Sequence, residues 1–131
     1  MAEVKYSYKY GHGYKDFSLE EEHVIGEIKV AELPPLENLK ASVLDALYHP
    51  IESAPINELV KPGQKVAFIC NDPTRVANSH DFMPILVAEM NKLGIKDEDM
   101  RIVFALGTHR DMTYEEMVEA VGEDIASRLS M

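Results

Sequence analysis

Residues 4–10 alternate between apolar and polar side chains, which predicts a half-buried strand at the start of a β-rich stretch over residues 3–32. The apolar positions are Val4, Tyr6, Tyr8 and Tyr10. The glycine-rich stretch at residues 10–14 has the composition of a hairpin turn. Residues 14–19 and 23–30 form two further extended pieces in this interpretation, so residues 1–33 are expected to be a small antiparallel β-rich section.

The pattern changes to a helical period after the pair Pro34-Pro35. Apolar residues then recur three or four positions apart, at Leu36, Leu39, Val43, Ala46 and Leu47. This spacing predicts an amphipathic helix that ends before Pro50. Residues 51–63 read as connecting chain with one helical turn near residues 56–60.

Two short apolar runs, KVAFIC at residues 65–70 and RIVFAL at 101–106, have the character of buried parallel strands. Between them, the apolar spacing predicts a helix that has Asp81 as its N-cap, Pro84 in its first turn and Gly94 near its end. Together these segments predict a strand–helix–strand unit with two parallel strands.

A final helix is predicted from Thr113 and Glu116, which have the spacing of a capping box. Gly122 interrupts it, and a last helical piece follows over residues 123–129. The whole chain is therefore expected to be one α/β domain, residues 1–131. Its α/β section, residues 36–131, is predicted to hold a parallel βαβ Rossmann-like sheet with helices on both faces.

Composition narrows the range of partners and locations. Acidic residues outnumber basic ones by 23 to 13 in the 131 residues, giving a net charge of −10, which argues against broad nucleic-acid binding. The sequence has no apolar run of about 18 residues that would span a membrane, and its first residues lack the apolar core of a signal peptide. With a single cysteine, Cys70, the chain is expected to be cytoplasmic.

The most informative polar residues come directly after the two apolar strands. The sequence NDPTR, residues 71–75, follows the first, and GTHR, residues 107–110, follows the second. In open α/β sheets, ligands bind where parallel strands end at their carboxyl ends. The rim formed by these loops is therefore expected to carry Asp72, Thr74, Arg75, Thr108, His109 and Arg110.

The side chains on this rim offer a consistent chemistry. Arg75 or Arg110 can hold a carboxylate or phosphate through paired hydrogen bonds. His109 can move a proton near neutral pH. Asp72 can orient the arginine or the histidine, and Gly107 allows close approach of the backbone to a ligand. We therefore expect Arg75 and His109 to share one cleft.

A plainer interpretation is available for the same loops. Asn-Asp-Pro-Thr is ordinary turn chemistry in which Asp72 and Thr74 bond to local backbone, and a single loop histidine is commonly just solvated. The other histidines, His12, His23, His49 and His80, show no metal-ligand spacing. Dinucleotide and P-loop fingerprints are absent from the sequence.

The two loops resemble the N-terminal domain of the lactate racemase family. That family carries D-x-T-R-P after one strand and G-[TF]-H-R after the next, and here these elements stand as residues 72–75 and 107–110. The stretch at residues 45–72 and the sequences GIKDEDMRIVFALGTHR and MTYEEMVEAVGEDI are also similar to the family. The resemblance covers residues 45–128 well and the β-rich start more loosely.

The resemblance implies an enzyme that inverts the chiral centre of a 2-hydroxy acid. Such enzymes use a nickel-pincer nucleotide that takes a hydride from the substrate and returns it, while two histidines exchange the hydroxyl proton. By position, His109 would be one of these histidines, Arg75 would hold the substrate carboxylate, and Asp72 would lie beside it in the pocket. The expected cofactor contacts on the rim are Thr74, Thr108 and Arg110.

Two features separate this chain from the family pattern. Val76 stands where the family has proline. The family's second histidine, its cofactor-linked lysine and its nickel ligand come later in the chain than residue 131, so this chain alone is expected to hold neither cofactor nor metal and to need a second domain. The alternatives are a non-catalytic module that binds a small phosphate- or carboxylate-containing ligand, and a domain kept for partner interactions.

Overall fold

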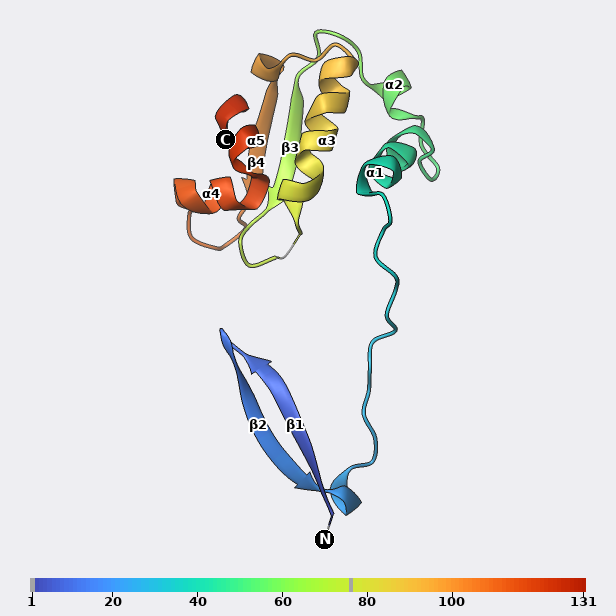
Figure 1. The fold of residues 1–131 in the computed structure, drawn as a ribbon. Helices are drawn as coiled ribbons and strands as arrows, with labels where there is room; N and C mark the ends of the chain where they lie inside the picture. Colours follow the sequence, from blue (N-terminus) through green and yellow to red (C-terminus); the bar gives the residue numbers. More distant parts are fainter. Residues whose placement is uncertain (1, 76) are drawn as a thin grey trace. The chain divides into compact units, whose positions relative to one another are not determined.

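The computed structural model describes residues 2–75 and 77–131, and these separate into two compact units. The units are Met1–Pro35 and Leu36–Met131, and the division lies beside the change from a strand to a helix pattern. Figure 1 shows the elements of each unit. Val76, where the sequence departs from the family pattern, lies outside the described residues.

The N-terminal unit is a two-stranded antiparallel hairpin. Strand β1, Glu3–Tyr10, pairs in full register with β2, Gly13–Glu20, and the glycine-rich stretch forms the tight turn between them, as predicted. The short 3-10 helix η1, Glu21–His23, follows. The predicted third strand over residues 23–30 is wrong, because residues 24–35 have no regular secondary structure.

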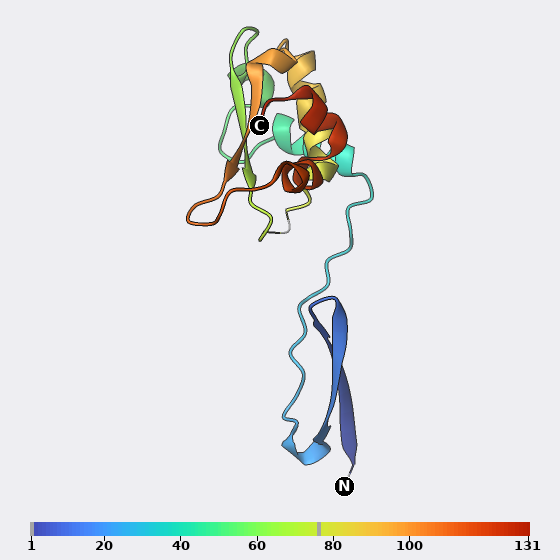
Figure 2. The same cartoon turned by 90° about the vertical axis from the view of Figure 1, so that its left-hand side faces the viewer.

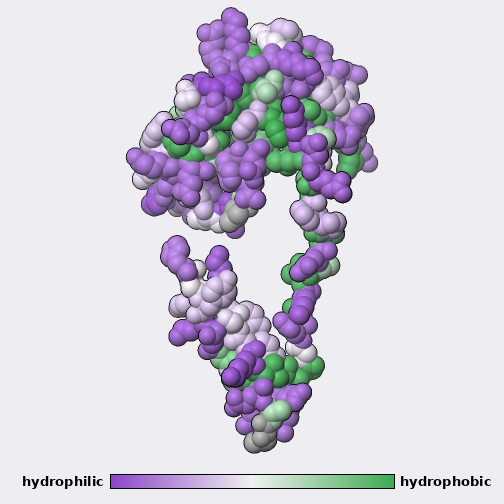
Figure 3. All heavy atoms as spheres, viewed as in Figure 1, coloured by the Kyte–Doolittle hydropathy of each residue, from purple (hydrophilic) through white to green (hydrophobic). Residues whose placement is uncertain are grey.

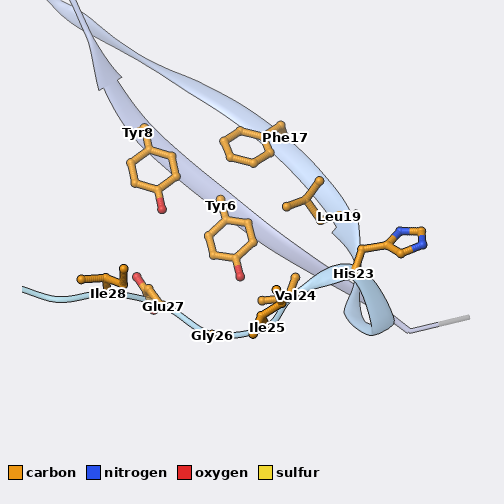
Figure 4. Close-up of a pocket in the computed structure, with 10 residues that line it drawn as sticks. All are labelled: Tyr6, Tyr8, Phe17, Leu19, His23, Val24, Ile25, Gly26, Glu27 and Ile28. Carbon is orange, nitrogen blue, oxygen red and sulfur yellow. The ribbon is translucent and has the colours of Figure 1, made fainter.

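Aromatic side chains line one face of the hairpin. The rings of Tyr6, Tyr8 and Phe17 stack with centroids 5.5 to 6.1 Å apart, and they face the extended segment after η1 (Figure 4). Even so, none of the described residues of this unit is buried. Hydrophobic residues lie open to solvent along the extended part of the chain (Figure 3). Ile25 and Ile28 of that segment are fully exposed.

The second unit contains the strand–helix–strand arrangement that the apolar runs predicted. Strands β3 and β4 are parallel neighbours, with Val66 opposite Met100 and Asn71 opposite Ala105. The elements in chain order are α1 (Leu39–Tyr48), α2 (Ile56–Leu59), β3 (Val66–Asn71), α3 (Ser79–Lys92), η2 (Asp97–Asp99), β4 (Met100–Ala105), α4 (Tyr114–Val121) and α5 (Glu123–Arg128).

The helices cover only one face of the parallel sheet, so the prediction of helices on both faces is wrong. Burial alternates along each strand: Cys70 and Ile102 are buried against the helices, whereas Ile69 is 75% exposed and Val103 is 45% exposed. Figure 2 shows the helices gathered on one side of β3 and β4. The uninterrupted apolar runs suggested burial on both faces, but alternate residues of each run remain open to solvent in the described part of the chain.

The core lies between the sheet and helices α3, α4 and α5. Its members, each at most 9% exposed, are Cys70, Met83, Val87, Met90, Ile95, Met100, Ile102, Val121, Ile125, Ala126 and Leu129. Burial raises the pKa of the Cys70 thiol, so this cysteine packs as a small apolar side chain. No helix among the described residues is both long enough and apolar enough to cross a membrane.

The buried carboxylate of Glu89 ties α1 to α3. It accepts hydrogen bonds from the hydroxyl of Tyr48 on α1 and from Nζ of Lys92, which lies 3.0 Å away. The hydrogen bond from Tyr48 is the largest cause of the lowered pKa of Glu89, so the carboxylate stays ionised.

At the end of α3, Gly94 has φ +91°, and a Cβ at this position would lie 2.9 Å from Cγ of Pro62, so glycine is required there.

The helix boundaries agree with the sequence at α4 and differ at α3. Thr113 and Glu116 form the predicted capping box, and Gly122 separates α4 from α5. Helix α3 begins at Ser79, two residues before the predicted N-cap Asp81, and Asn78 takes the N-cap position in a left-handed conformation with φ 50°. Pro84 therefore lies inside the helix instead of in its first turn.

Because the core covers one face of the parallel sheet, we expect alanine substitutions at two isoleucines of this sheet to lower the free energy of unfolding by different amounts. Ile102→Ala removes a side chain that is 1% exposed, so we expect the free energy of unfolding to fall by about 2–5 kcal/mol. The matched change Ile69→Ala, on the uncovered face, should alter it by no more than about 1 kcal/mol. Urea unfolding of both variants measures this, and similar losses at the two sites would contradict a sheet covered on one face.

Candidate functional site

Parallel pairing brings the two polar loops to the same edge of the sheet. Asn71 and Ala105, which end β3 and β4, are opposite each other, so the loops after them start side by side. In the first loop, the backbone N–H of Arg75 donates to the carbonyl of Asp72 at 3.2 Å. In the second, the N–H of His109 donates to the carbonyl of Leu106 at 3.0 Å, and Gly107 takes the positive φ of 60° that this turn requires.

Asp72 is the residue that joins the loops. Its Oδ1 accepts the backbone N–H of Thr74 at 2.9 Å and the Thr74 hydroxyl at 2.6 Å. Its Oδ2 contacts Nδ1 of His109. The side chain of Asp72 is 6% exposed, whereas that of His109 is 46% exposed. A buried carboxylate thus supports an imidazole that remains open to solvent.

The hydrogen bonds to Asp72 fix its charge. The Thr74 hydroxyl, followed by the contact with His109, lowers the pKa of Asp72 from 3.8 to about 2 against the opposing effect of burial. Asp72 is therefore ionised near neutral pH and can only accept hydrogen bonds. It follows that Nδ1 of His109 carries the proton in this contact, which leaves Nε2 as the ring nitrogen available to another group.

A cleft of about 290 Å³ lies beside Asp72. It is lined by the loop after β3, by the start of α3 and by α4, with Arg75, His80, Glu116 and Glu119 among its walls. Arg75 is exposed. His109 is not one of the lining residues, although its partner Asp72 is. That one ligand reaches both Arg75 and His109 stays a prediction.

The other residues of the predicted rim differ in their side-chain contacts. The guanidinium of Arg110 is paired with both carboxylate oxygens of Glu116, at 2.9 and 2.6 Å. Thr74 donates its hydroxyl to Asp72, and Thr108 is exposed in the turn. The sequence analysis used Glu116 only as a helix cap and missed its pairing with Arg110. The signal that could have revealed this pairing is the closeness of Arg110 to the capping box in the sequence.

The N-terminal unit has two other candidate sites. A hollow of about 460 Å³ in the N-terminal unit is lined by the hairpin aromatics and the segment after η1, with His23 and Glu27 among its walls (Figure 4). In the same unit, Glu20, Glu22 and His23 form the only group of three metal-ligating side chains in the described part of the chain. His23 is 67% exposed and pairs loosely with both carboxylates, at 3.7 and 3.8 Å, as surface charges do.

Comparison with known proteins identifies the family. Residues 10–131 match the family described as the lactate racemase N-terminal domain. The lactate racemase of Lactiplantibacillus plantarum is 36% identical over 86 residues, which is 66% of this chain and 20% of that protein. That of Thermoanaerobacterium thermosaccharolyticum is 29% identical over 118 residues, which is 88% of this chain and 28% of that protein.

A solved structure supports the same assignment. The lactate racemase apoprotein from Thermoanaerobacterium thermosaccharolyticum superposes with a TM-score of 0.73 at 26% identity, covering 97% of this chain and 29% of that one. The chain thus spans between 20% and 29% of the length of these relatives. It belongs to the lactate racemase N-terminal domain family.

Proposed function

We propose that this chain supplies one side of the active site of a lactate racemase-like enzyme that inverts a 2-hydroxy acid centre. The observation that carries the proposal is the contact between buried, ionised Asp72 and exposed His109. A carboxylate that holds Nδ1–H and leaves Nε2 free is the arrangement by which histidine acts as a general base and then as a general acid. The remainder of the site comes from protein that this chain does not span.

His109 would exchange the proton of the substrate hydroxyl. Oxidation of a 2-hydroxy acid to the keto acid removes a hydride from the α-carbon and a proton from the hydroxyl oxygen. Nε2 of His109 takes that proton from one enantiomer while Asp72 stabilises the positive ring, and the same nitrogen returns a proton when that enantiomer re-forms. Inversion also needs a proton-carrying group on the opposite face of the substrate, which we assign to the rest of the enzyme.

Arg75 would hold the substrate carboxylate. Its guanidinium is exposed on the cleft beside Asp72, and the planar fork of arginine matches a carboxylate through two parallel hydrogen bonds. Glu119 also lines this cleft and adds a negative charge there, whereas the charge of Glu116 is offset by its pairing with Arg110.

The rim does not fit a nickel site by its own residues. Asp72 uses both carboxylate oxygens for Thr74 and His109, and no group of three metal ligands occurs there among the described residues. The nickel-pincer nucleotide that the family resemblance implies would supply the hydride acceptor and donor when bound. Of the proposed cofactor contacts, Thr74 donates its hydroxyl to Asp72 and Arg110 is paired with Glu116, whereas Thr108 is exposed in its turn.

Kinetics of the intact enzyme that contains this domain test these roles. His109→Gln should lower kcat about 100- to 10,000-fold, the usual contribution of a positioned acid or base. Arg75→Lys should mainly raise KM, because lysine keeps the charge but loses the paired hydrogen bonds. His49→Gln and Arg101→Lys, at exposed sites away from the rim, are the matched controls.

The alternative of a non-catalytic anion-binding module predicts another outcome. In that case Arg75→Lys would weaken ligand binding, whereas His109→Gln would leave every measured property of the enzyme unchanged. Near-normal turnover of the His109→Gln variant, with the protein correctly folded, would rule out the proposed role.

The lowered pKa of Asp72 predicts a specific loss of stability in acid. Its pKa is about 2 in the folded chain and 3.8 ordinarily, so ionised Asp72 stabilises the fold above about pH 4 and this contribution is lost as the pH falls toward 2. Asp72→Asn should lower the Tm at neutral pH and flatten the change in Tm between pH 4 and 2. Asp111→Asn, at an exposed carboxylate of the second loop, should keep the normal slope. An unchanged slope in Asp72→Asn would contradict the assigned pKa.

A further inference from the structure

The loop that carries His109 is attached to helix α4 through one glutamate. Glu116 receives two hydrogen bonds from the guanidinium of Arg110, at 2.9 and 2.6 Å, and a third from the backbone N–H of Thr113 at 2.9 Å. Thr113 completes the capping box by accepting the N–H of Glu116 at 3.3 Å. One carboxylate therefore holds both the first turn of the helix and the residue that directly follows His109.

The loop is fixed on both sides of His109. Before it, the turn from Leu106 and the contact with Asp72 set the position of the imidazole. After it, Arg110 is held by Glu116 and also donates to the carbonyl of Asp111 at 2.8 Å. Met112, two residues after Arg110, is 7% exposed and anchors the following part of the loop in the protein interior. Among the described residues, Arg110 supplies the side-chain hydrogen bonds of the chain between His109 and Met112.

We infer that Glu116 is a positioning residue, which through Arg110 holds His109 against Asp72. In this proposal Arg110 serves the contact with Glu116. The consequence for catalysis rests on the function proposed above, but the positioning itself is a property of this chain. It can be measured without activity.

The geometry of the pair supports a positioning role over an incidental surface contact. The two parallel N–H to oxygen bonds fix the orientation of the guanidinium plane as well as its distance. Arg110 is the largest cause of the lowered pKa of Glu116, which is about 2, so the carboxylate stays charged through the neutral range. The side chain of Glu116 is 27% exposed and that of Arg110 is 68% exposed, so salt weakens the pair without abolishing it.

Glu116→Gln separates the positioning role from the helix cap. Glutamine is the other residue that completes a capping box, because its amide oxygen still accepts the backbone N–H of Thr113. The variant loses only the charged, two-bond contact with Arg110. Arg110→Gln removes the same contact from the opposite side, and Glu115→Gln, in the same first turn of α4, is the matched control for loss of a negative charge at the start of the helix.

The readout is the exchange of the His109 Nδ1 proton with water, measured by NMR on this chain. Loss of the Glu116 contact loosens the loop, so Glu116→Gln and Arg110→Gln should each speed exchange about two- to ten-fold, the range for one partly exposed charge-assisted hydrogen bond. The double variant should add nothing, because either change already breaks the pair. Glu115→Gln should leave exchange unchanged.

Asp72→Asn distinguishes failure of this inference from failure of the proposed function. If Asp72→Asn speeds exchange but Glu116→Gln and Arg110→Gln do not, Glu116 is a helix cap only and the inference is overturned, while the pairing of Asp72 with His109 stands. If Asp72→Asn has no effect, the pairing itself is refuted. Additive effects of the two single changes would also overturn the inference, because they would show that Glu116 and Arg110 act separately.

Discussion

The arrangement of the rim depends on one buried carboxylate. Asp72 lies at the end of β3, accepts two hydrogen bonds from Thr74 within its own loop, and uses its second oxygen for His109 in the next loop. An ionised group that is removed from water must have its hydrogen bonds satisfied by the protein. The two loops meet this need together, so moving either one leaves Asp72 underbonded. This constraint sets the position and the tautomer of the histidine.

The sheet makes that constraint possible, and the core holds the sheet. Because β3 and β4 are parallel and in register, their ends coincide and a side chain from one loop reaches the other. The core behind them is built from alternate residues of each strand and from α3, α4 and α5. Helix α4 contributes twice, since Val121 packs in this core and Glu116 is bonded to the loop of His109. Stability and placement of the site are thereby linked through one helix.

The sequence predicted the features that depend on local pattern. The apolar runs gave β3 and β4, and the spacing of Thr113 and Glu116 gave the start of α4. The position of the two polar loops at one sheet edge followed from parallel pairing. The start of α3 was missed because Asn78 and Asp81 are both favourable N-cap residues, and the apolar spacing does not show that Asn78 takes the position, in a left-handed conformation.

Other features depend on tertiary contacts that a pattern does not contain. An apolar strand has the same sequence pattern whether helices cover one of its faces or both. The sequence therefore did not predict the open face around Ile69 and Val103. Arginine beside a presumed ligand site suggests anion binding, but the choice of Glu116 as the partner of Arg110 depends on where α4 lies. The extended segment at residues 24–35 contains several apolar residues, but these residues do not pair with the hairpin as a third strand.

The central claim is that Asp72 holds His109 with its proton on Nδ1 and with Nε2 free, and the ring-nitrogen NMR spectrum of this chain tests it most directly. At a pH where His109 is neutral, the account predicts a protonated Nδ1 and an unprotonated Nε2 for this residue. Predominant protonation of Nε2, or the mixed signal of a solvated histidine, would contradict it.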